Sequence, residues 1–255
     1  MEYEDIIYEK KNGIATITIN RPKKLNALRQ KTWIETYNAI VDASTDCVIG
    51  VIVLTGSGDR AFCAGADQNE EETPEYRMMA KSLARGITNA TKPVIAAVNG
   101  YAIGSGNWLA YLCDFTIASE NAIFGQTGPR VGSPPTGWNI PYLAWVVGEK
   151  RAREMWMMCR QYSAQDALEM GLVNRVVPAD KLAEEVEKWC KELLALSPTA
   201  LKAAKSSFNC ATQLLYSAEP LEEWIAQPYI GSEESKEGVN AFLEKRDPDF
   251  GKFRK

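Results

Sequence analysis

Two short segments rich in small residues have the composition of loops that bring main-chain N–H groups close to a ligand. They are RAFCAGADQ at residues 60–68 and NGYAIGSGNW at residues 99–108. Small side chains let a ligand approach the main chain closely. The Gly-Ser-Gly stretch at 104–106 precedes a helical pattern at 107–112, and N–H groups at a helix N-terminus are unpaired and carry partial positive charge. One N–H from each loop could hold a carbonyl oxygen as negative charge develops on it, which is the chemistry of an oxyanion hole.

Taken singly, each loop is equally well explained by tight packing under a helix, because such loops are common. The pair is a stronger indication than either loop. Both follow apolar strand patterns, and α/β sheets bind ligands at the C-terminal ends of their parallel strands. We therefore predict that the two loops act on one ligand.

The chain contains no histidine. This excludes Ser-His-Asp and Cys-His catalysis in their usual forms. It also removes the commonest metal ligand, and no carboxylate cluster replaces it, so we expect no metal site. The remaining groups for chemistry are Asp, Glu, Tyr, Ser, Lys and the main chain.

The composition is that of an ordinary globular protein, with 255 residues, 45% of them hydrophobic and 24% charged, and a net charge of −4. One large domain is expected for this length. No basic stripe indicates a nucleic-acid partner, and the longest apolar runs are too short to cross a membrane. The six cysteines form no CxxC pair and no secretory signal opens the chain, so we expect reduced thiols in a cytoplasmic protein.

Strand and helix patterns that alternate before residue 139 predict crossover units and a mostly parallel sheet. The predicted helix at 32–43 places Trp33, Tyr37, Ile40 and Val41 on one side. From residue 139 onward the sequence is almost wholly helical in pattern, and Gly171 suits a helix C-cap. The predicted strands are 13–20, 48–54, 94–98 and 115–118. The later helices are predicted at 149–159, 164–170, 179–196, 198–208 and 220–226.

Three motifs in the sequence also resemble those of a known family. CAGAD, then NGYAIGSG and CDFTIASENAIFGQ, are similar to the crotonase (enoyl-CoA hydratase/isomerase) superfamily along essentially the whole chain. The resemblance implies an α/β fold, a spiral of ββα units over about residues 1–195 of one domain (1–255), with a helical trimerisation region over about 196–255. It implies a CoA-thioester substrate, assembly as a homotrimer or hexamer, and Ala66 and Ser105 as the two oxyanion donors.

Within the superfamily, IFGQTGPRVGS, AREMWMMCRQYSAQDALEMGLVN and the tail EGVNAFLEKRDPDFGKFRK look most similar to two branches. These are the 1,4-dihydroxy-2-naphthoyl-CoA synthases and the 2-ketocyclohexanecarboxyl-CoA hydrolases, which make or break a carbon–carbon bond beside a CoA thioester. The hydratases of the superfamily use two glutamates, and this chain has Trp108 and Gly128 in their places. Standard addition of water by two carboxylates is therefore in doubt.

The two branches also imply roles for residues after position 125. A bound bicarbonate that acts as base would lie near Gln126, Thr127, Gly128 and Trp156, and Gly128 is expected to leave room where a carboxylate would stand. No other cofactor beyond the CoA group is implied. Ser133 matches a catalytic serine and Tyr229 a tyrosine that donates to the substrate.

The sequence departs from both branches at Pro135, where they carry an aspartate, and proline cannot replace a carboxylate in proton transfer. The segment between Gln68 and Lys81 is also shorter than in the synthases. Both differences lie where the acyl part of the substrate is expected, and they indicate a changed substrate or reaction.

Several residues are predicted to contact substrate, and some of them have a structural alternative. Trp108 and Trp138 could line a flat ring pocket or simply belong to the core. Asp67 is better explained as a residue that ties its loop. Basic residues could hold the CoA phosphates or be ordinary surface charges. The predicted substrate-binding set is Lys24, Ala27, Ala64, Asp67, Gln68, Tyr76, Gly104, Trp108, Gln126, Thr127, Pro135, Trp138, Trp156, Lys245 and Lys252.

Three functions remain open. The first is cleavage or closure of a carbon–carbon bond in a cyclic acyl-CoA through a thioester enolate. The second is hydration or isomerisation of an alicyclic enoyl-CoA with non-standard acid and base groups. The third is a non-catalytic protein that binds a CoA thioester.

Overall fold

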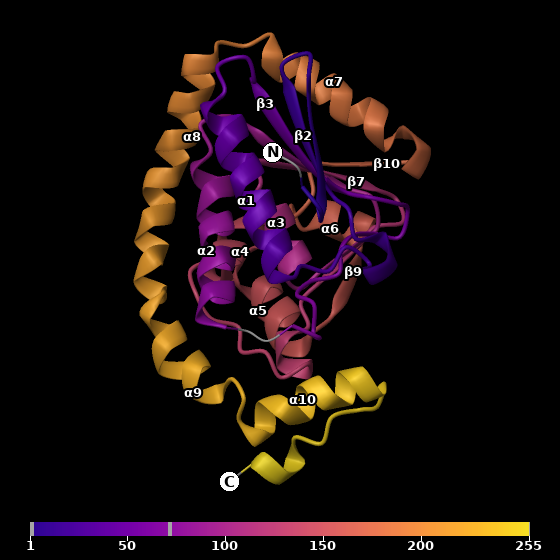
Figure 1. Cartoon of the computed structure of the whole chain (residues 1–255), viewed down its shortest axis with the longest axis vertical. Helices are drawn as coiled ribbons and strands as arrows, with labels where there is room; N and C mark the ends of the chain where they lie inside the picture. The colour runs from indigo at the N-terminus through magenta and orange to yellow at the C-terminus, as the bar shows by residue number, and fades with distance from the viewer. Residues whose placement is uncertain (1–2, 71–72, 255) are drawn as a thin grey trace. The chain divides into compact units, whose positions relative to one another are not determined.

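The computed structural model describes residues 3–70 and 73–254. The chain divides into two compact units, each made of two stretches of sequence. Unit 1 comprises residues 1–124 and 162–210, and unit 2 comprises residues 125–161 and 211–255. An α/β fold with sheets and many helices is confirmed (Figure 1).

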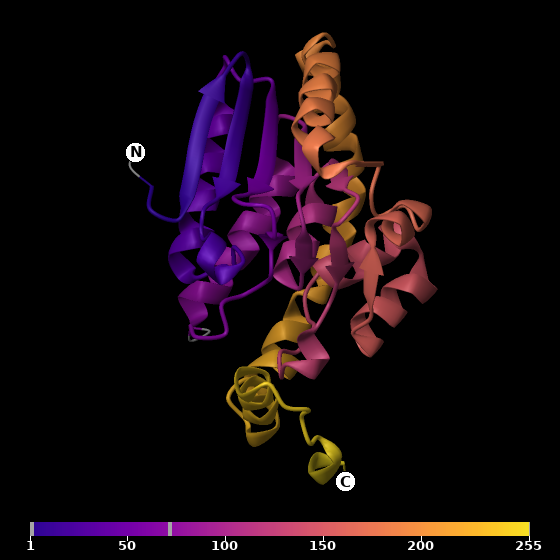
Figure 2. The same ribbon diagram turned by 90° about the vertical axis from the view of Figure 1, so that its right-hand side faces the viewer.

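Unit 1 is built on a six-stranded sheet with the order β1-β2-β3-β5-β7-β10. Figure 2 shows its first strands, in indigo and purple, side by side. Only β1 is antiparallel to its neighbour β2; the other described pairs are parallel. Asn12 and Gly13 join β1 to β2 with positive φ at both residues, as a tight hairpin requires. The strands are β1 (Ile6–Lys11), β2 (Ile14–Ile19), β3 (Val51–Gly56), β5 (Val94–Val98), β7 (Phe115–Ser119) and β10 (Arg175–Val177).

The parallel strands are long apolar runs because both faces of the sheet are covered. On one face Val53, Ile95 and Ile117 pack against Val186 and other apolar residues of α7 (Leu182–Leu194). Helix α1 (Gln30–Thr45) contacts the first three strands, and it lies beside α2 (Pro74–Asn89) (Figure 1).

Two sequence predictions in this region are wrong in part. The strand expected to begin at Val48 begins at Val51, because Val48 lies in the turn before β3 and is 73% exposed. Helix α1 buries Trp33 and Ile40 as expected, but Val41 faces outward and is 41% exposed. At 100° per residue Val41 falls beyond the buried stripe, which continues through Ala39 and Ala43.

A second sheet of short strands has the order β4-β6-β8-β9. Its three-residue strands lie in segments that the sequence predicts as loop or helix, and β10 likewise interrupts the region expected to be helical. Gly171, with φ +82°, follows helix α6 (Ala164–Glu169) as predicted. The strands are β4 (Ala61–Cys63), β6 (Tyr101–Ile103), β8 (Ile123–Gly125) and β9 (Gln161–Ser163).

Unit 2 is helical. Its helices α4 and α5 pack together, and Gly148 joins them with φ +83°. Helix α10 rests on the loop at Gly132, where Gly238 touches the main chain closely and the Ser235 hydroxyl donates to the Gly132 carbonyl oxygen over 2.8 Å. The elements are η2 (Gly128–Arg130), α4 (Asn139–Val147), α5 (Glu149–Met158), η4 (Gln213–Ala218), the π-helix η5 (Glu222–Ala226), α9 (Gln227–Tyr229), α10 (Glu233–Glu244) and η6 (Gly251–Phe253).

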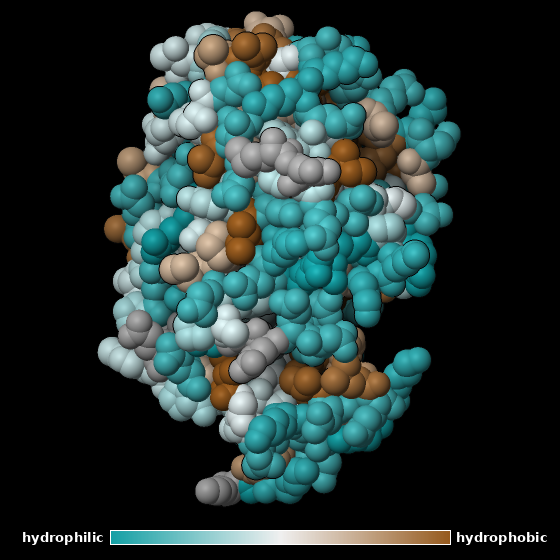
Figure 3. Space-filling model, in the orientation of Figure 1, coloured by the Kyte–Doolittle hydropathy of each residue, from teal (hydrophilic) through white to brown (hydrophobic). Residues whose placement is uncertain are grey.

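Helix α8 (Pro198–Thr212) starts in unit 1, and its Lys205 is buried. On the face drawn in Figure 3 polar residues predominate and apolar residues occur in small groups. None of the helices in the described part of the chain is long and apolar enough to span a membrane.

Candidate active site

The first predicted loop is held by main-chain hydrogen bonds on both of its sides. After β4, the Ala64 N–H donates to the Leu25 carbonyl oxygen over 3.0 Å. Leu28 and Ala66 form an isolated parallel bridge, in which the Leu28 N–H donates to Gly65 and the Asp67 N–H donates to Leu28, over 2.8 and 2.9 Å. Both bonds use the neighbours of Ala66, so its own N–H points away from the bridge. No hydrogen bond between described residues uses that N–H.

The second loop ends at the start of α3 (Ser105–Leu112). Gly104 is the N-cap residue, with φ +57° and ψ −120°, a conformation that favours glycine. Ser105 is therefore the first helical residue, and its N–H has no acceptor within the helix. Across the described chain it has no other hydrogen-bond partner.

The structure brings the two loops into contact. A Cβ at Gly65 would lie 3.0 Å from the Ile103 carbonyl oxygen and 3.6 Å from the Ser105 nitrogen. Gly106 lies directly against the Cys63 carbonyl oxygen, with no room for a side chain. The loops follow β4 and β6, which are parallel neighbours in the second sheet, rather than the long strands β3 and β5 named by the sequence pattern. Two unpaired N–H groups therefore lie on adjoining segments of main chain.

The cysteine beside these loops is not a candidate nucleophile. Complete burial raises the pKa of the Cys63 thiol to about 12, so it stays protonated at neutral pH. The Gly65 N–H lies 3.4 Å from Cys63 Sγ and only partly offsets the cost of burial. The reactive groups of this site are main-chain donors.

Asp67 ties its own loop. Its Oδ1 accepts from the Asn69 main chain and side chain over 3.2 and 2.9 Å, and its Oδ2 accepts from Arg21 over 3.0 Å. Burial opposes ionisation, but the hydrogen bonds from Asn69 and Arg21 outweigh it, and the pKa of Asp67 lies below its usual value. These contacts match the structural alternative in the sequence interpretation.

Other predicted substrate contacts of unit 1 follow the same two segments. Lys24 is exposed in η1 (Pro22–Lys24), and Ala27 and Ala64 are half-buried. The Gln68 side chain donates to the Ala66 carbonyl oxygen over 3.4 Å. The run 24–28 therefore lies alongside the run 64–68 through the main-chain bonds already described.

Trp108 and Tyr76 belong to an aromatic cluster around Trp33. The rings of Trp33 and Trp108 stack at 5.4 Å with an interplanar angle of 8°, and Tyr76 meets Trp33 edge-on at 5.9 Å. Trp108 is only 9% exposed. The Tyr76 hydroxyl donates to the Leu28 carbonyl oxygen over 3.1 Å, at the bridge that orients Ala66. Trp108 thus packs within unit 1, as its core alternative describes, and Tyr76 packs in the same cluster.

Unit 2 holds the predicted anion-binding residues. Gln126 is 1% exposed, and its Nε2 has no hydrogen-bond partner in the described chain; the buried Trp156 Nε1 lacks one too. The Trp156 ring lies 3.9 Å from where a Cβ on Gly128 would stand. Thr127 precedes η2 and its carbonyl oxygen accepts from Arg130 over 2.9 Å. Buried donors normally have a hydrogen-bond partner, so Gln126 Nε2 and Trp156 Nε1 are exceptions among the described residues.

The structure does not leave the space that was expected on the side of Gly128 where a side chain would begin. A Cβ there would lie 2.7 Å from the Ser133 carbonyl oxygen, and the Ser133 N–H donates to the Gly128 carbonyl oxygen over 2.9 Å. This turn closes on itself, so the sequence prediction of space for a carboxylate is wrong on the Cβ side.

The remaining predicted residues of unit 2 have different surroundings. Ser133 is half-buried and Pro135 is exposed. Trp138 is 2% exposed and meets the rings of Tyr142 and Tyr216 edge-on, so it is a core residue of unit 2. Tyr229 ends α9, and burial together with Glu234 raises its pKa.

The two predicted tail lysines are both exposed. Lys245 ends α10 with φ +57°. Lys252 pairs with Glu237 over 3.3 Å, so part of its charge is already neutralised. In the described residues no group of three or more Cys, Asp or Glu side chains could hold a metal ion.

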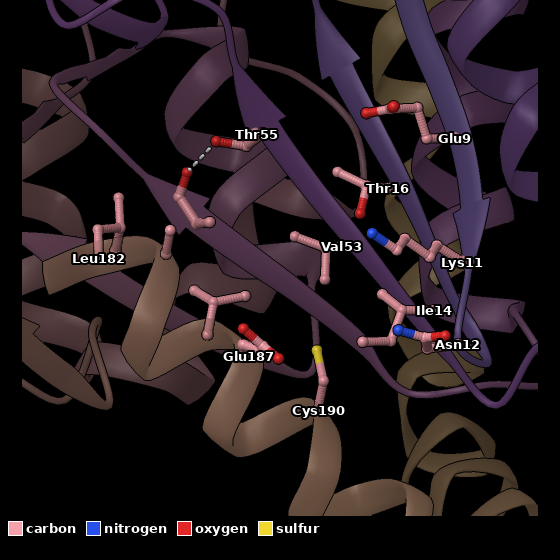
Figure 4. Close-up of a pocket in the computed structure, with 13 residues that line it drawn as sticks. Glu9, Lys11, Asn12, Ile14, Thr16, Val53, Thr55, Leu182, Glu187 and Cys190 are labelled. Atoms are coloured by element: carbon pink, nitrogen blue, oxygen red, sulfur yellow. Dashed lines mark hydrogen bonds between the residues drawn. The ribbon is translucent and has the colours of Figure 1, made fainter.

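A cavity of about 500 Å³ lies in unit 1 between the sheet and α7, and no residue predicted from the sequence lines it (Figure 4). Val53 and Cys190 form part of its apolar wall, while Glu9, Lys11 and Glu187 contribute polar side chains to its lining. Burial raises the pKa of Cys190 to about 12. The lining residues come from elements far apart in sequence, so no local pattern could have indicated the cavity.

The family model described as enoyl-CoA hydratase/isomerase matches residues 9–253. An enoyl-CoA hydratase from Mycobacterium avium subsp. paratuberculosis K-10 is 32% identical over 98% of this chain and 99% of its own, with a TM-score of 0.90. An enoyl-CoA hydratase subunit from Geobacillus kaustophilus HTA426 is 35% identical over 98% and 99% of the two chains, with a TM-score of 0.78. A methylmalonyl CoA decarboxylase is 27% identical over 98% and 99%, with a TM-score of 0.89.

Proposed function

The chain belongs to the enoyl-CoA hydratase/isomerase family, and from that premise we propose that it is an acyl-CoA enzyme in which the Ala66 and Ser105 N–H groups polarise the thioester carbonyl. The observation that carries this proposal is the pair of unpaired N–H groups on touching loops. Such donors are already oriented before charge develops, so they stabilise an oxyanion without reorganising.

The charge on that oxygen is the charge of an enolate. An enolate forms when the carbon beside the thioester carbonyl loses a proton, a carboxyl group or an acyl group, and it is consumed when a bond to that carbon forms. One oxyanion hole therefore serves cleavage and closure of carbon–carbon bonds alike. The similar methylmalonyl CoA decarboxylase is, by its name, an enzyme that breaks such a bond.

We favour carbon–carbon chemistry on a cyclic acyl group over addition of water. Trp108 stacks on Trp33 and has no group that transfers a proton. Gly128 has no side chain, and Pro135 offers no carboxylate. The three segments that resemble the naphthoyl-CoA synthases and ring hydrolases also favour ring cleavage or closure.

The base in this proposal is a small anion, such as bicarbonate, held in unit 2. Its support is the pair of buried, unpartnered donors Gln126 Nε2 and Trp156 Nε1. A buried donor without a partner costs about 1–3 kcal/mol, and an anion that accepts from both removes that cost. Ser133 and Tyr229 are the proposed hydroxyl donors to the substrate, and neutral tyrosine suits that role because burial raises its pKa.

A second candidate is a hydratase or isomerase of an alicyclic enoyl-CoA. Its support is the similarity to two enoyl-CoA hydratases at 32% and 35% identity. Its acid and base groups would have to differ from two glutamates at positions 108 and 128. Binding of a CoA thioester without turnover is the third outcome.

Product analysis with three CoA thioesters separates these functions. A cyclic β-keto acyl-CoA, a cyclic enoyl-CoA and a saturated cyclohexyl acyl-CoA are incubated in D2O and followed by NMR and mass spectrometry. Ring cleavage is expected to convert the first into an open chain with a new carboxylate. Hydration of the cyclic enoyl-CoA, with no cleavage of the β-keto acyl-CoA, would overturn that proposal in favour of the hydratase. If even the α-proton of the saturated cyclohexyl acyl-CoA does not exchange, the protein binds CoA thioesters without turning them over.

Substitution of Gly128 tests the proposed anion. With a cyclic β-keto acyl-CoA as substrate, wild-type turnover is expected to rise when bicarbonate is added to CO2-depleted buffer. Gly128→Ala tests crowding alone, since its Cβ meets the Ser133 carbonyl oxygen. Gly128→Asp adds a fixed negative charge and is expected to lose the response to bicarbonate altogether. Equal responses in all three proteins would contradict a base at this position.

We also propose self-association as a homotrimer or hexamer. Large apolar side chains of the C-terminal region, such as Phe208, Leu214 and Trp224, are more than 70% exposed in the single chain. Light scattering coupled to size exclusion measures the mass directly, and a monomer at micromolar concentration would contradict the proposal.

A further inference from the structure

Arg21 lies at the edge of the first oxyanion loop and is not among the residues predicted from the sequence to act on substrate. It is the residue before η1, and its side chain is 14% exposed. The main chain holds it in place: its N–H donates to Asn26 Oδ1, and its carbonyl oxygen accepts from the Lys24 and Asn26 N–H groups, all within 3.0 Å. The main-chain position from which the guanidinium extends is therefore fixed.

That guanidinium joins both sides of the bridge that orients Ala66. Nη1 donates to the Ala27 carbonyl oxygen, and Nη2 donates to Asp67 Oδ2 over 3.0 Å. Ala27 directly precedes Leu28, and Asp67 directly follows Ala66. The bridge itself has only two main-chain bonds, Leu28 to Gly65 and Asp67 to Leu28. The arginine adds a side-chain connection to these bonds and to the Ala64–Leu25 bond between the same two segments.

The surroundings keep this connection charged and buried. The Asp67 side chain is 9% exposed and that of Asp5 is 5% exposed, and Asp5 Oδ2 lies 3.8 Å from Arg21 Nε. Arg29 and Thr32 bind Asp5 more closely, at 2.7 and 2.6 Å, so Asp5 does not depend on Arg21. In contrast, Arg21 is the only cation paired with Asp67 among the described residues.

We propose that Arg21 is a positioning residue for the reaction, which fixes the angle between residues 27–28 and 66–67 and so the direction of the Ala66 N–H. This inference rests on the proposed function of that N–H. Arginine suits the task because its planar fork presents donors in two fixed directions, whereas lysine offers a single point charge on a flexible stem. A misplacement of about 1 Å at a reacting centre can lower a rate by about 100-fold.

The readout is the polarisation of a bound carbonyl, which a merely stabilising residue would not alter in a folded protein. A conjugated dienoyl-CoA is bound to the full chain, and its ultraviolet absorption is recorded free and bound. In the wild-type protein the band is expected to move to longer wavelength, because donors at the carbonyl oxygen draw charge along the conjugated chain. Arg21→Gln is expected to lose more than half of that shift, with Arg21→Lys intermediate.

Kinetics of α-proton exchange in D2O give the second readout. Arg21→Gln is expected to lower kcat by about 10- to 100-fold, with KM changed less than threefold, because the thioester still binds but is less polarised. Arg29→Gln is the matched control, since it removes a neighbouring cation from Asp5 but contacts neither Ala27 nor Asp67. It is expected to keep the spectral shift and kcat. Circular dichroism confirms that each protein tested is folded.

The outcomes separate the two proposals. A wild-type protein that binds the dienoyl-CoA without a spectral shift overturns the proposed function. A wild-type shift that persists undiminished in Arg21→Gln overturns the role of Arg21 alone. If Arg21→Gln does not fold, Arg21→Lys and Asp67→Asn replace it, and an undiminished shift in both has the same meaning.

Discussion

Replacement of Ser105 by proline is expected to lower kcat by about 100- to 1,000-fold, the usual effect of losing one oxyanion donor. Ser105 is the first residue of α3, where the helix has no use for the N–H and where the fixed φ of proline suits the helix. The substitution therefore replaces one N–H of the site by the proline Cδ, which cannot donate and also crowds the oxygen, at little cost to the helix. The measurement is steady-state turnover of whichever thioester the product analysis identifies, or α-proton exchange.

Ser105→Ala is the matched control because it removes the hydroxyl and keeps the N–H. It is expected to retain kcat within a few-fold. Unfolding by urea tests whether Ser105→Pro leaves the protein intact. A proline variant that folds and turns over at the wild-type rate would show that Ser105 supplies no donor.

Replacement of Lys205 by methionine is expected to destabilise unit 1 by about 3 kcal/mol, at the lower end for breaking a buried pair because Asp114 is about a quarter exposed. All three donors of the Lys205 ammonium are used: they reach the carbonyl oxygens of Ile87 and Lys92, each over 3.1 Å, and Asp114 Oδ2 over 2.6 Å. Asp114 also accepts from the Val94 N–H at the start of β5. Methionine has a side chain of similar length but leaves the two carbonyl oxygens and the Asp114 carboxylate without their cation.

The loss should depend on pH. Burial raises the pKa of Asp114 and Lys205 opposes that rise, so removal of the lysine raises the pKa further. A group with a raised pKa in the folded state contributes stability below its unfolded pKa, about 4, and loses it as the pH rises through the folded pKa. The deficit of Lys205→Met is therefore expected to be small near pH 4 and largest at neutral pH.

Urea unfolding of both proteins between pH 4 and pH 8 measures this difference. Lys202→Met, an exposed position on the same helix, is the control and is expected to change the free energy of unfolding by less than about 0.5 kcal/mol. A deficit in Lys205→Met that is equal at both ends of the pH range would mean that Asp114 does not carry the effect.

The sequence predicted the parts of this fold that depend on long local patterns. Strands β2 and β5 and helix α1 follow from apolar runs and spacing, and the glycines at 104 and 106 correctly marked the start of a helix. The segments of β4 and β6 were predicted to be loops, because three residues are too few to show the alternation of apolar and polar side chains that is typical of a strand. Strand β10 escaped notice because Arg175–Val177 stands between two helices and finds its partner, β7, far back in the chain.

The candidate site, too, could be predicted from the sequence only in part. The two loops could be identified because glycines and small residues leave a mark in the sequence itself. The obstruction at Gly128 could not, since it comes from the carbonyl oxygen of Ser133 folding back over the turn. The contact of Arg21 with Asp67 spans 46 positions and depends on where the loop returns to the N-terminal segment. Trp108 was recognised as unusual, but only its stack with Trp33 shows what the ring does.

The return of the chain to unit 1 after residue 161 has a consequence for the order of folding. During synthesis the first 124 residues can form five strands of the main sheet, but β7 then ends the sheet with an unpaired edge. Its partner β10 and the helix α7 that covers one face arrive only after the whole 125–161 segment has been made. Exposed edges and uncovered apolar faces invite pairing with other chains. We therefore expect the nascent chain to be most prone to aggregation while the face of the sheet that α7 covers is still exposed, that is, until residues 182–194 have been made.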